Sequence, residues 1–260
     1  MANENMHANS DIPTSSETIE VLHNRVSVRT FKPEPVPEAQ VEAVLRAALR
    51  APTSSNIQAY SVVVVRDVES RRRLSVATGN QPHVAETPVF LAFCADLTRI
   101  ERALRRHGHG LDDNNNLELG LVSTIDAALV GMSAYLAADS LGLKGVMIGG
   151  VRNDPAEVAR ILDLPHRVYC VFGMCLGWPS STPQQKPRMD YHDIVHFERY
   201  RRDGLDRALD AYDAALASHY RQMGKPTAAD SWTGEIDAKF SGPQRDDLRR
   251  ALGEMGFDFR

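Results

Sequence analysis

Two arginines that bracket a serine are the first residues in the chain whose types and spacing could bind a ligand. Arg25, Ser27 and Arg29 alternate with Val26 and Val28. If the chain is extended here, alternate side chains point to opposite sides, and β-branched valines favour that conformation. The valines would anchor one side, while two guanidinium groups and a hydroxyl on the other would suit a phosphate. A solvated loop beside a helix end is the alternative interpretation.

A second cationic pair, Lys186 and Arg188, flanks Pro187 far along the chain. In an extended segment these two cations also face the same way. Four cations exceed what a sugar phosphate needs, but they suit a terminal phosphate dianion on a ligand with a large planar head.

The polar segment from Thr53 to Gln58 could meet the edges of such a planar head. It combines hydroxyl side chains with an asparagine and a glutamine, which donate and accept hydrogen bonds. A capped turn between a helix and a strand is the alternative interpretation. Paired glycines, Gly149 and Gly150, end a predicted strand further on, and glycine lets the backbone approach a flat ligand closely.

Helices and buried strands are expected to position these residues. A capping box at Thr14 and Glu17 opens the first helix, and Pro37 suits the first turn of the second. We expect helices at 14–24, 37–49, 68–78, 117–141, 155–162, 205–223 and 244–253. Apolar runs predict strands at 60–66, 89–95, 145–150 and 167–176.

Composition narrows the possible partners. The formal net charge is -4, so a nucleic-acid partner is not expected. Three cysteines lie in apolar runs, which indicates reduced, buried thiols in a cytoplasmic protein. Glu118, Asp126 and Asp139 interrupt the longest apolar stretch, so we expect a buried helix there and no membrane span.

Residues 96–113 are charged and rich in glycine and asparagine, and we interpret them as a surface loop that could act as a lid. A metal site built from His107, His109, Asp112 and Asp113 is the less favoured alternative. The chain has no dinucleotide-binding glycine motif after a strand, no P-loop, no nucleophile elbow and no zinc-protease motif. A Rossmann dinucleotide site and a serine hydrolase are therefore disfavoured.

Taken together, the motifs resemble those of the oxygen-insensitive, FMN-dependent NAD(P)H nitroreductases, in the branch of the major nitroreductase and the related flavin reductases. The resemblance covers about residues 17–240, and the order of the motifs is more specific than any one of them. The matching segments are Arg25–Phe31, Thr53–Gln58, Gly79–Ala85, Ser140–Leu143, Ile148–Asn153, Gly173–Pro179 and Lys186–Arg188.

This resemblance implies an α+β fold, with a mostly antiparallel sheet flanked by helices and strand exchange within a homodimer. It implies a disordered tail at 1–13, an FMN-binding core at 14–200, and a helical arm at 201–260 that packs on the core and the partner. NADPH or NADH would pass hydride to flavin N5, and a nitroaromatic, quinone or similar acceptor would then take two electrons. The alternatives are an oxidoreductase that supplies reduced free flavin, and a flavin-binding carrier or sensor without turnover.

The resemblance also implies which residues form the site, with no catalytic side chain because the chemistry occurs at the cofactor. Residues expected to bind the cofactor are Arg25, Val26, Ser27, Arg29, Thr53, Ser54, Ser55, Gln81, Ile148, Gly149, Gly150, Lys186 and Arg188. Residues expected to line the substrate pocket are Ser55, Asn56, Asn153 and Arg245.

Overall fold

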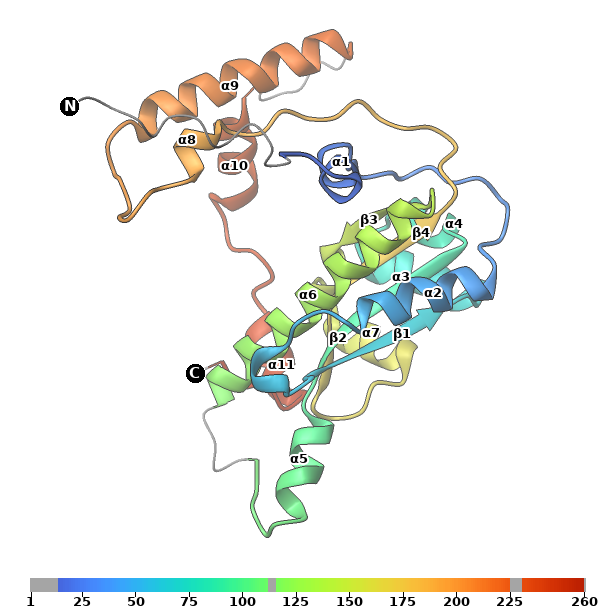
Figure 1. Ribbon diagram of the computed structural model, residues 1–260. Helices are drawn as coiled ribbons and strands as arrows, with labels where there is room; N and C mark the ends of the chain where they lie inside the picture. The colour runs from blue at the N-terminus through green and yellow to red at the C-terminus, as the bar shows by residue number, and fades with distance from the viewer. Residues whose placement is uncertain (1–13, 112–115, 225–230, 260) are drawn as a thin grey trace, which may run out of the picture. The chain divides into compact units, whose positions relative to one another are not determined.

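A computed structural model describes residues 14–111, 116–224 and 231–259 (Figure 1). The chain forms two compact units, one of residues 1–183 with 247–260 and the other of residues 184–246. The sequence instead places the start of the C-terminal arm at 201. The predicted tail at 1–13 lies outside the described residues, and the packing of an arm on a partner stays a prediction.

The first unit is built on a four-stranded antiparallel sheet in the order β1-β2-β4-β3. The predicted α+β fold and all four strands are confirmed. The strands are β1 (Tyr60–Val65), β2 (Val89–Asp96), β3 (Lys144–Ile148) and β4 (Val168–Gly177). A register shift between Phe93 and Cys94 lets β2 follow β4 along its whole length.

The long helix α6 (Asn116–Ser140) packs on one face of the sheet together with α2 (Glu38–Ala48) (Figure 1). Alternate residues of β2, including Leu91 and Phe93, enter the core that these two helices cover. The rings of Phe93 and Phe172 stack at 5.1 Å. The predicted helix at 117–141 is therefore confirmed in its extent, but only one side of it is buried in the core.

The other residues of β2, including Phe90 and Cys94, enter a second core on the opposite face. Helices α3 (Val68–Ala77) and α7 (Pro155–Leu162) pack together with α4 (Pro82–Glu86) and the short 3₁₀ helix η2 (Gly149–Arg152) on this side. All three cysteines are buried and free, as the sequence predicts.

Three short helices complete the first unit: α1 (Glu17–His23), α5 (Thr98–Arg105) and α11 (Leu248–Glu254). The second unit contains α8 (Tyr191–Ile194), α9 (Leu205–Gln222) and α10 (Trp232–Phe240). The sequence predicts α9 correctly, but we expected neither α8 nor α10.

Several local predictions are wrong. Ser16, and not Thr14, caps α1 by accepting a hydrogen bond from the Ile19 amide. Helix α5 occupies residues 98–105 of the predicted loop at 96–113. Its charged residues form pairs along the helix, such as Arg105 with Glu101. Strand β3 ends at Ile148, since the following glycines turn into η2.

By length and composition α6 could span a membrane, because the segment Leu117–Ser140 has a mean hydropathy of 1.5. Half of the most apolar window is buried inside the protein, and core helices commonly pass the same test. The length and apolar composition of α6 are thus weak evidence for a membrane span.

Substituting a core glycine should test how tightly the sheet is packed. A Cβ on Gly173 would overlap the ring of Phe90, which is fully buried. We expect Gly173→Ala to lower the free energy of unfolding by about 1–3 kcal/mol in urea titrations, because overpacked cores are strained. Gly253→Ala is the matched control, since a Cβ there meets open space. An unchanged unfolding free energy in Gly173→Ala would contradict this packing.

Candidate functional site

The segment from Arg25 to Arg29 has one buried side and one polar side, as its sequence predicts. The side chains of Val26 and Val28 are buried, while Arg25 and Ser27 are half-buried and Arg29 is exposed. The segment forms no regular strand, but the Val28 amide donates to the carbonyl of Gly145 in β3 at 3.0 Å. The two valines therefore anchor the segment beside the sheet.

Tyr135 of helix α6 holds the start of the Arg25–Arg29 segment. The Tyr135 hydroxyl donates to the Val26 carbonyl, and the Arg25 guanidinium lies 5.6 Å from the Tyr135 ring centre. Burial raises the pKa of Tyr135, although the positive charge of Arg25 opposes that shift. Arg25 also approaches the Ser27 hydroxyl, with Nη1 to Oγ at 3.5 Å. The cation and the hydroxyl are thus on the same side of the chain.

The charge of Arg29 acts on His83 in α4. Burial lowers the pKa of His83, and Arg29 lowers it further, while Glu86 acts in the opposite direction. The Nε2 atom of His83 is buried, and none of the described residues offers it a hydrogen bond. This places the arginine segment close to the helix that follows Gln81.

Three other predicted site residues meet at the carbonyl of Thr78. Gln81 donates to this oxygen through Nε2 at 2.8 Å, and Asn153 does so through Nδ2 at 3.2 Å. Any Cβ on Gly150 would collide with the same carbonyl and with the Gln81 amide. Only glycine fits at 150, and the structure brings Gln81, Gly150 and Asn153 together.

The side chain of Ile148 is buried in the second core, so only its backbone could face a ligand. Gly149 follows within η2 and is half-buried. This part of the prediction therefore depends on the backbone and not on side chains.

The polar segment between α2 and β1 has an unusual backbone. Ser55, Asn56 and Gln58 have φ values of 46°, 56° and 54°. These lie in the left-handed region of backbone conformation, which residues other than glycine rarely adopt. Residues 54–56 form the 3₁₀ helix η1 (Ser54–Asn56). The side chains of Ser55, Asn56 and Gln58 are exposed. Each such conformation costs roughly 1–2 kcal/mol, so other contacts must hold the loop.

A fully buried carboxylate on α6 supplies those contacts. Asp126 accepts hydrogen bonds from the backbone amides of Ser54, through Oδ1, and Ala59, through Oδ2, both at 3.0 Å. Hydrogen bonds to a charged acceptor contribute about 1.5–3 kcal/mol each, which is enough to offset the strained backbone. Arg99 of α5 holds the far side by donating to the carbonyls of Gln58 and Tyr60. Sequence reasoning missed both anchors.

Along α6, Asp126, which holds this loop, lies nine positions before Tyr135, which holds Val26. At a rise of about 1.5 Å per residue, the two anchors are roughly 13 Å apart. The polar loop is therefore fixed further along α6 than the arginine segment.

The remaining predicted residues belong to the second unit. Lys186 donates through Nζ to the Tyr220 hydroxyl at 2.5 Å, and that hydroxyl donates to Glu235 at 2.6 Å. Arg188 donates to the backbone carbonyls of Lys186 and Pro187. Arg245 is exposed with a φ of 53°. Their approach to the first unit stays a prediction.

The sequence profile of the nitroreductase family matches residues 22–178, more than half of the chain, and that of the family's C-terminal domain matches residues 186–260. The chain belongs to the nitroreductase family. The expected family is thereby confirmed.

Similar proteins extend over nearly the whole of this nitroreductase. The oxygen-insensitive NADPH nitroreductase of Salmonella typhimurium is 38% identical over 246 residues, which cover 94% of this chain and 100% of that protein. The structure of B. megaterium NfrA1 has a TM-score of 0.90 and 34% identity, and covers 94% of this chain and 100% of that chain. The NADPH:FMN oxidoreductase from Vibrio harveyi, solved in complex with NAD+, has a TM-score of 0.83 and 33% identity, with 94% and 100% covered.

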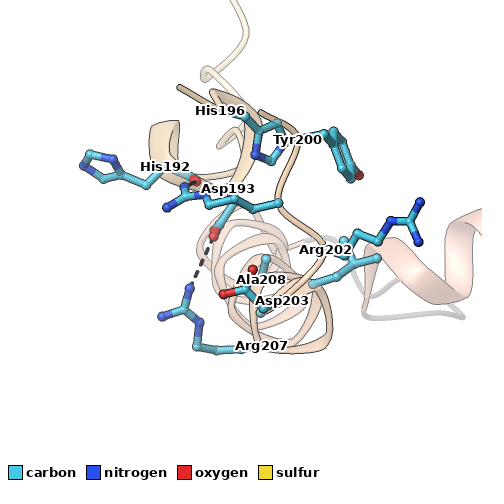
Figure 2. A pocket seen from close by; sticks show the side chains of 11 residues that line it. His192, Asp193, His196, Tyr200, Arg202, Asp203, Arg207 and Ala208 are labelled. Carbon is cyan, nitrogen blue, oxygen red and sulfur yellow. Dashed lines mark hydrogen bonds and ion pairs between the residues drawn. The ribbon is translucent and has the colours of Figure 1, made fainter. Parts of the chain in front are cut away.

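The second unit of this nitroreductase also has a pocket that sequence reasoning missed, with a volume of about 680 Å³ (Figure 2). Figure 2 shows Asp193 directed at Arg207, and the two form an ion pair at 3.5 Å. The rings of His196 and Tyr200 lie 4.4 Å apart, and Arg201 donates to the His192 carbonyl. These contacts join lining residues to one another, and the Asp193–Arg207 pair joins α8 to the start of α9.

Metal-ligating side chains do not gather in the described part of the chain, where no three or more His, Cys, Asp or Glu residues form a possible metal site. The alternative built on His107 and His109 also needs Asp112 and Asp113, which lie outside the described residues.

The environment of His83 predicts a pH dependence of stability. Because its pKa is lowered in the folded state, the unfolded chain binds a proton more readily at this position. Unfolding free energy should therefore fall as the pH drops below about 6.5, the ordinary histidine pKa. Between pH 7.5 and pH 5.5, urea titrations should show a smaller loss of unfolding free energy in His83→Gln than in the wild type. Equal losses in the two proteins would contradict the assignment.

Proposed function

We propose that this protein is an FMN-dependent NAD(P)H oxidoreductase that passes two electrons to nitroaromatics, quinones or similar acceptors. The observation that carries the proposal is the polar face of Arg25, Ser27 and Arg29, which is anchored beside β3 and α6. The end-to-end similarity to the Salmonella typhimurium nitroreductase supports the same activity.

The residues present fit the phosphate of FMN. Two guanidinium groups and a hydroxyl are held on one side of a segment whose opposite side is buried. Guanidinium groups bind phosphate through paired, charge-assisted hydrogen bonds. The buried, unpartnered Nε2 of His83 near Arg29 adds a polar atom that the described residues leave unsatisfied. We propose that Lys186 and Arg188 complete this phosphate site.

The rest of the cofactor would be held by polar groups and backbone. We propose that Gln81 and the residues Thr53, Ser54 and Ser55 meet the ribityl hydroxyls and ring edge, while Val26 and the Ile148–Gly150 backbone lie along the cofactor. Ser55, Asn56, Asn153 and Arg245 would line the space for the donor and the acceptor. When bound, FMN supplies the hydride-accepting N5 atom, and NADPH or NADH supplies the hydride. The chain's own residues bind and orient these molecules.

A homodimer is part of the proposal, and an apolar stripe on α6 supports it. Leu117, Leu121, Ile125 and Leu129 recur every four residues and are 39%, 47%, 54% and 39% exposed. Contiguous exposed apolar side chains at this spacing are typical of a helix that packs against a partner. We propose that a second copy covers the stripe, with strand exchange and with the arm at 201–260 packing on the partner. The buried free thiols favour a cytoplasmic protein.

Free flavin is the second candidate acceptor, because the similar Vibrio harveyi protein is named an NADPH:FMN oxidoreductase. Comparing kcat/KM for free FMN with kcat/KM for nitrofurazone separates the two functions. A higher value for nitrofurazone favours the nitroreductase, and a higher value for FMN favours the flavin reductase.

The test of the proposed function is a titration of the purified protein with FMN, followed by stopped-flow mixing with NADPH or NADH. We expect a yellow complex whose visible absorbance is bleached by at least one donor. Absence of FMN binding would refute the proposal, whereas binding without bleaching by either donor would indicate a flavin carrier.

Removing one cation should weaken cofactor binding. Arg29→Ala is expected to cost about 1.5–3 kcal/mol of FMN binding free energy, the contribution of one charged hydrogen bond. Fluorescence titration of FMN measures the effect, with Arg46→Ala as control, because Arg46 forms an ion pair with Glu42 on the surface of α2. Unchanged FMN affinity in Arg29→Ala would show that this cation does not bind the phosphate.

A further inference from the structure

Both ends of the polar loop are bound by one side chain that lies far from it in the sequence. Ser54 is exposed, yet its backbone amide donates to the fully buried carboxylate of Asp126. The second oxygen of that carboxylate takes the amide of Ala59, where the chain enters β1. The two bonds close the loop, which leaves Ser55, Asn56 and Gln58 exposed while Ile57 packs against the core.

We propose that Asp126 is a positioning residue, which holds the loop so that Ser55 and Asn56 face the cofactor and the acceptor. This proposal rests on the proposed function, which places both residues at the site. The left-handed backbone of Ser55 and Asn56 makes the requirement specific, since few other contacts in the described residues favour it.

The chemistry of the contact requires a carboxylate. Ionised aspartate accepts hydrogen bonds at both oxygens, and here each oxygen meets one backbone N–H. An asparagine of the same size has one accepting oxygen and one donating NH₂ group. The backbone N–H at one end of the loop would then meet the asparagine NH₂ group, which cannot accept a hydrogen bond. That end of the loop should be released.

Arg99 is a second anchor of the loop, and it determines which end should loosen when the Asp126 contact is lost. It holds the Gln58 and Tyr60 carbonyls from α5, so the C-terminal end of the loop has a second anchor. The Ser54 end has no comparable partner in the described part of the chain. Loss of the Asp126 contact should therefore loosen the loop mainly at Ser54–Asn56.

Hydrogen exchange on the unliganded protein tests the anchor itself. In the wild type we expect the Ser54 amide to exchange at least about tenfold more slowly than the Ser55 amide, for which the described residues offer no acceptor. Asp126→Asn should speed exchange at Ser54 by about tenfold and leave the amides of β2 and β4 unchanged. Equal wild-type rates at Ser54 and Ser55 would overturn the proposal even if the variant failed to fold.

A double-mutant cycle on the FMN-loaded enzyme tests positioning. Asn56→Ala should raise the KM for nitrofurazone about fivefold in the wild type, and Asp126→Asn alone should raise it similarly. Because both changes disable the same loop, the double variant should be no worse than Asp126→Asn. The control is Ser123→Ala, because Ser123 is a buried polar residue whose hydroxyl donates to carbonyls of its own helix. Its effect should add to that of Asn56→Ala.

The outcomes separate this proposal from the proposed function. Wild-type protein that binds no FMN would overturn the function and, with it, the role of the loop. Normal wild-type turnover with additive effects of Asp126→Asn and Asn56→Ala, or with faster exchange throughout the sheet, would overturn only the role of Asp126 and leave it a core residue.

Discussion

Three buried polar groups on α6 hold the segments on which the candidate site depends. Asp126 binds the two ends of the polar loop, Tyr135 binds the Val26 carbonyl, and Asp139 pairs with Lys144 at the start of β3 at 2.5 Å. The rest of the helix is largely apolar and packs against the sheet or forms the exposed stripe. One helix thus fixes the core and, through its few polar residues, the positions of residues far apart in the chain.

Some arginines in this chain support the backbone, whereas Arg29 is exposed where a ligand could reach it. Arg71 is buried and donates to the Ala85 and Thr87 carbonyls, and Arg152 donates to the Val171 carbonyl. Arg71 thereby holds the end of α4, whereas Arg152 binds within β4, and both are structural uses of the planar fork. Arg29 is exposed and acts on its neighbours mainly through charge. The sequence shows the same residue type in each case, and only the structure separates the two uses.

Much of the fold follows from sequence patterns, since burial requires apolar periodicity. The strands, the long helix and the buried valines at 26 and 28 are all predicted in this way. Helix α5 was missed, because its charged residues resemble a loop when their pairing along the helix is ignored. The apolar stretch containing Asp126 predicts a buried helix but not which distant amides the carboxylate binds. Left-handed conformations at Ser55 and Asn56 were unpredictable for the same reason, since tertiary contacts impose them.

The central claim is that the polar face of the Arg25–Arg29 segment binds the phosphate of a flavin. The most direct test compares the affinity of the purified protein for FMN with its affinity for riboflavin, which has the same ring and no phosphate. Two charged hydrogen bonds at about 1.5–3 kcal/mol each predict that FMN binds at least about 100-fold more tightly. Equal affinities for the two flavins would contradict the account.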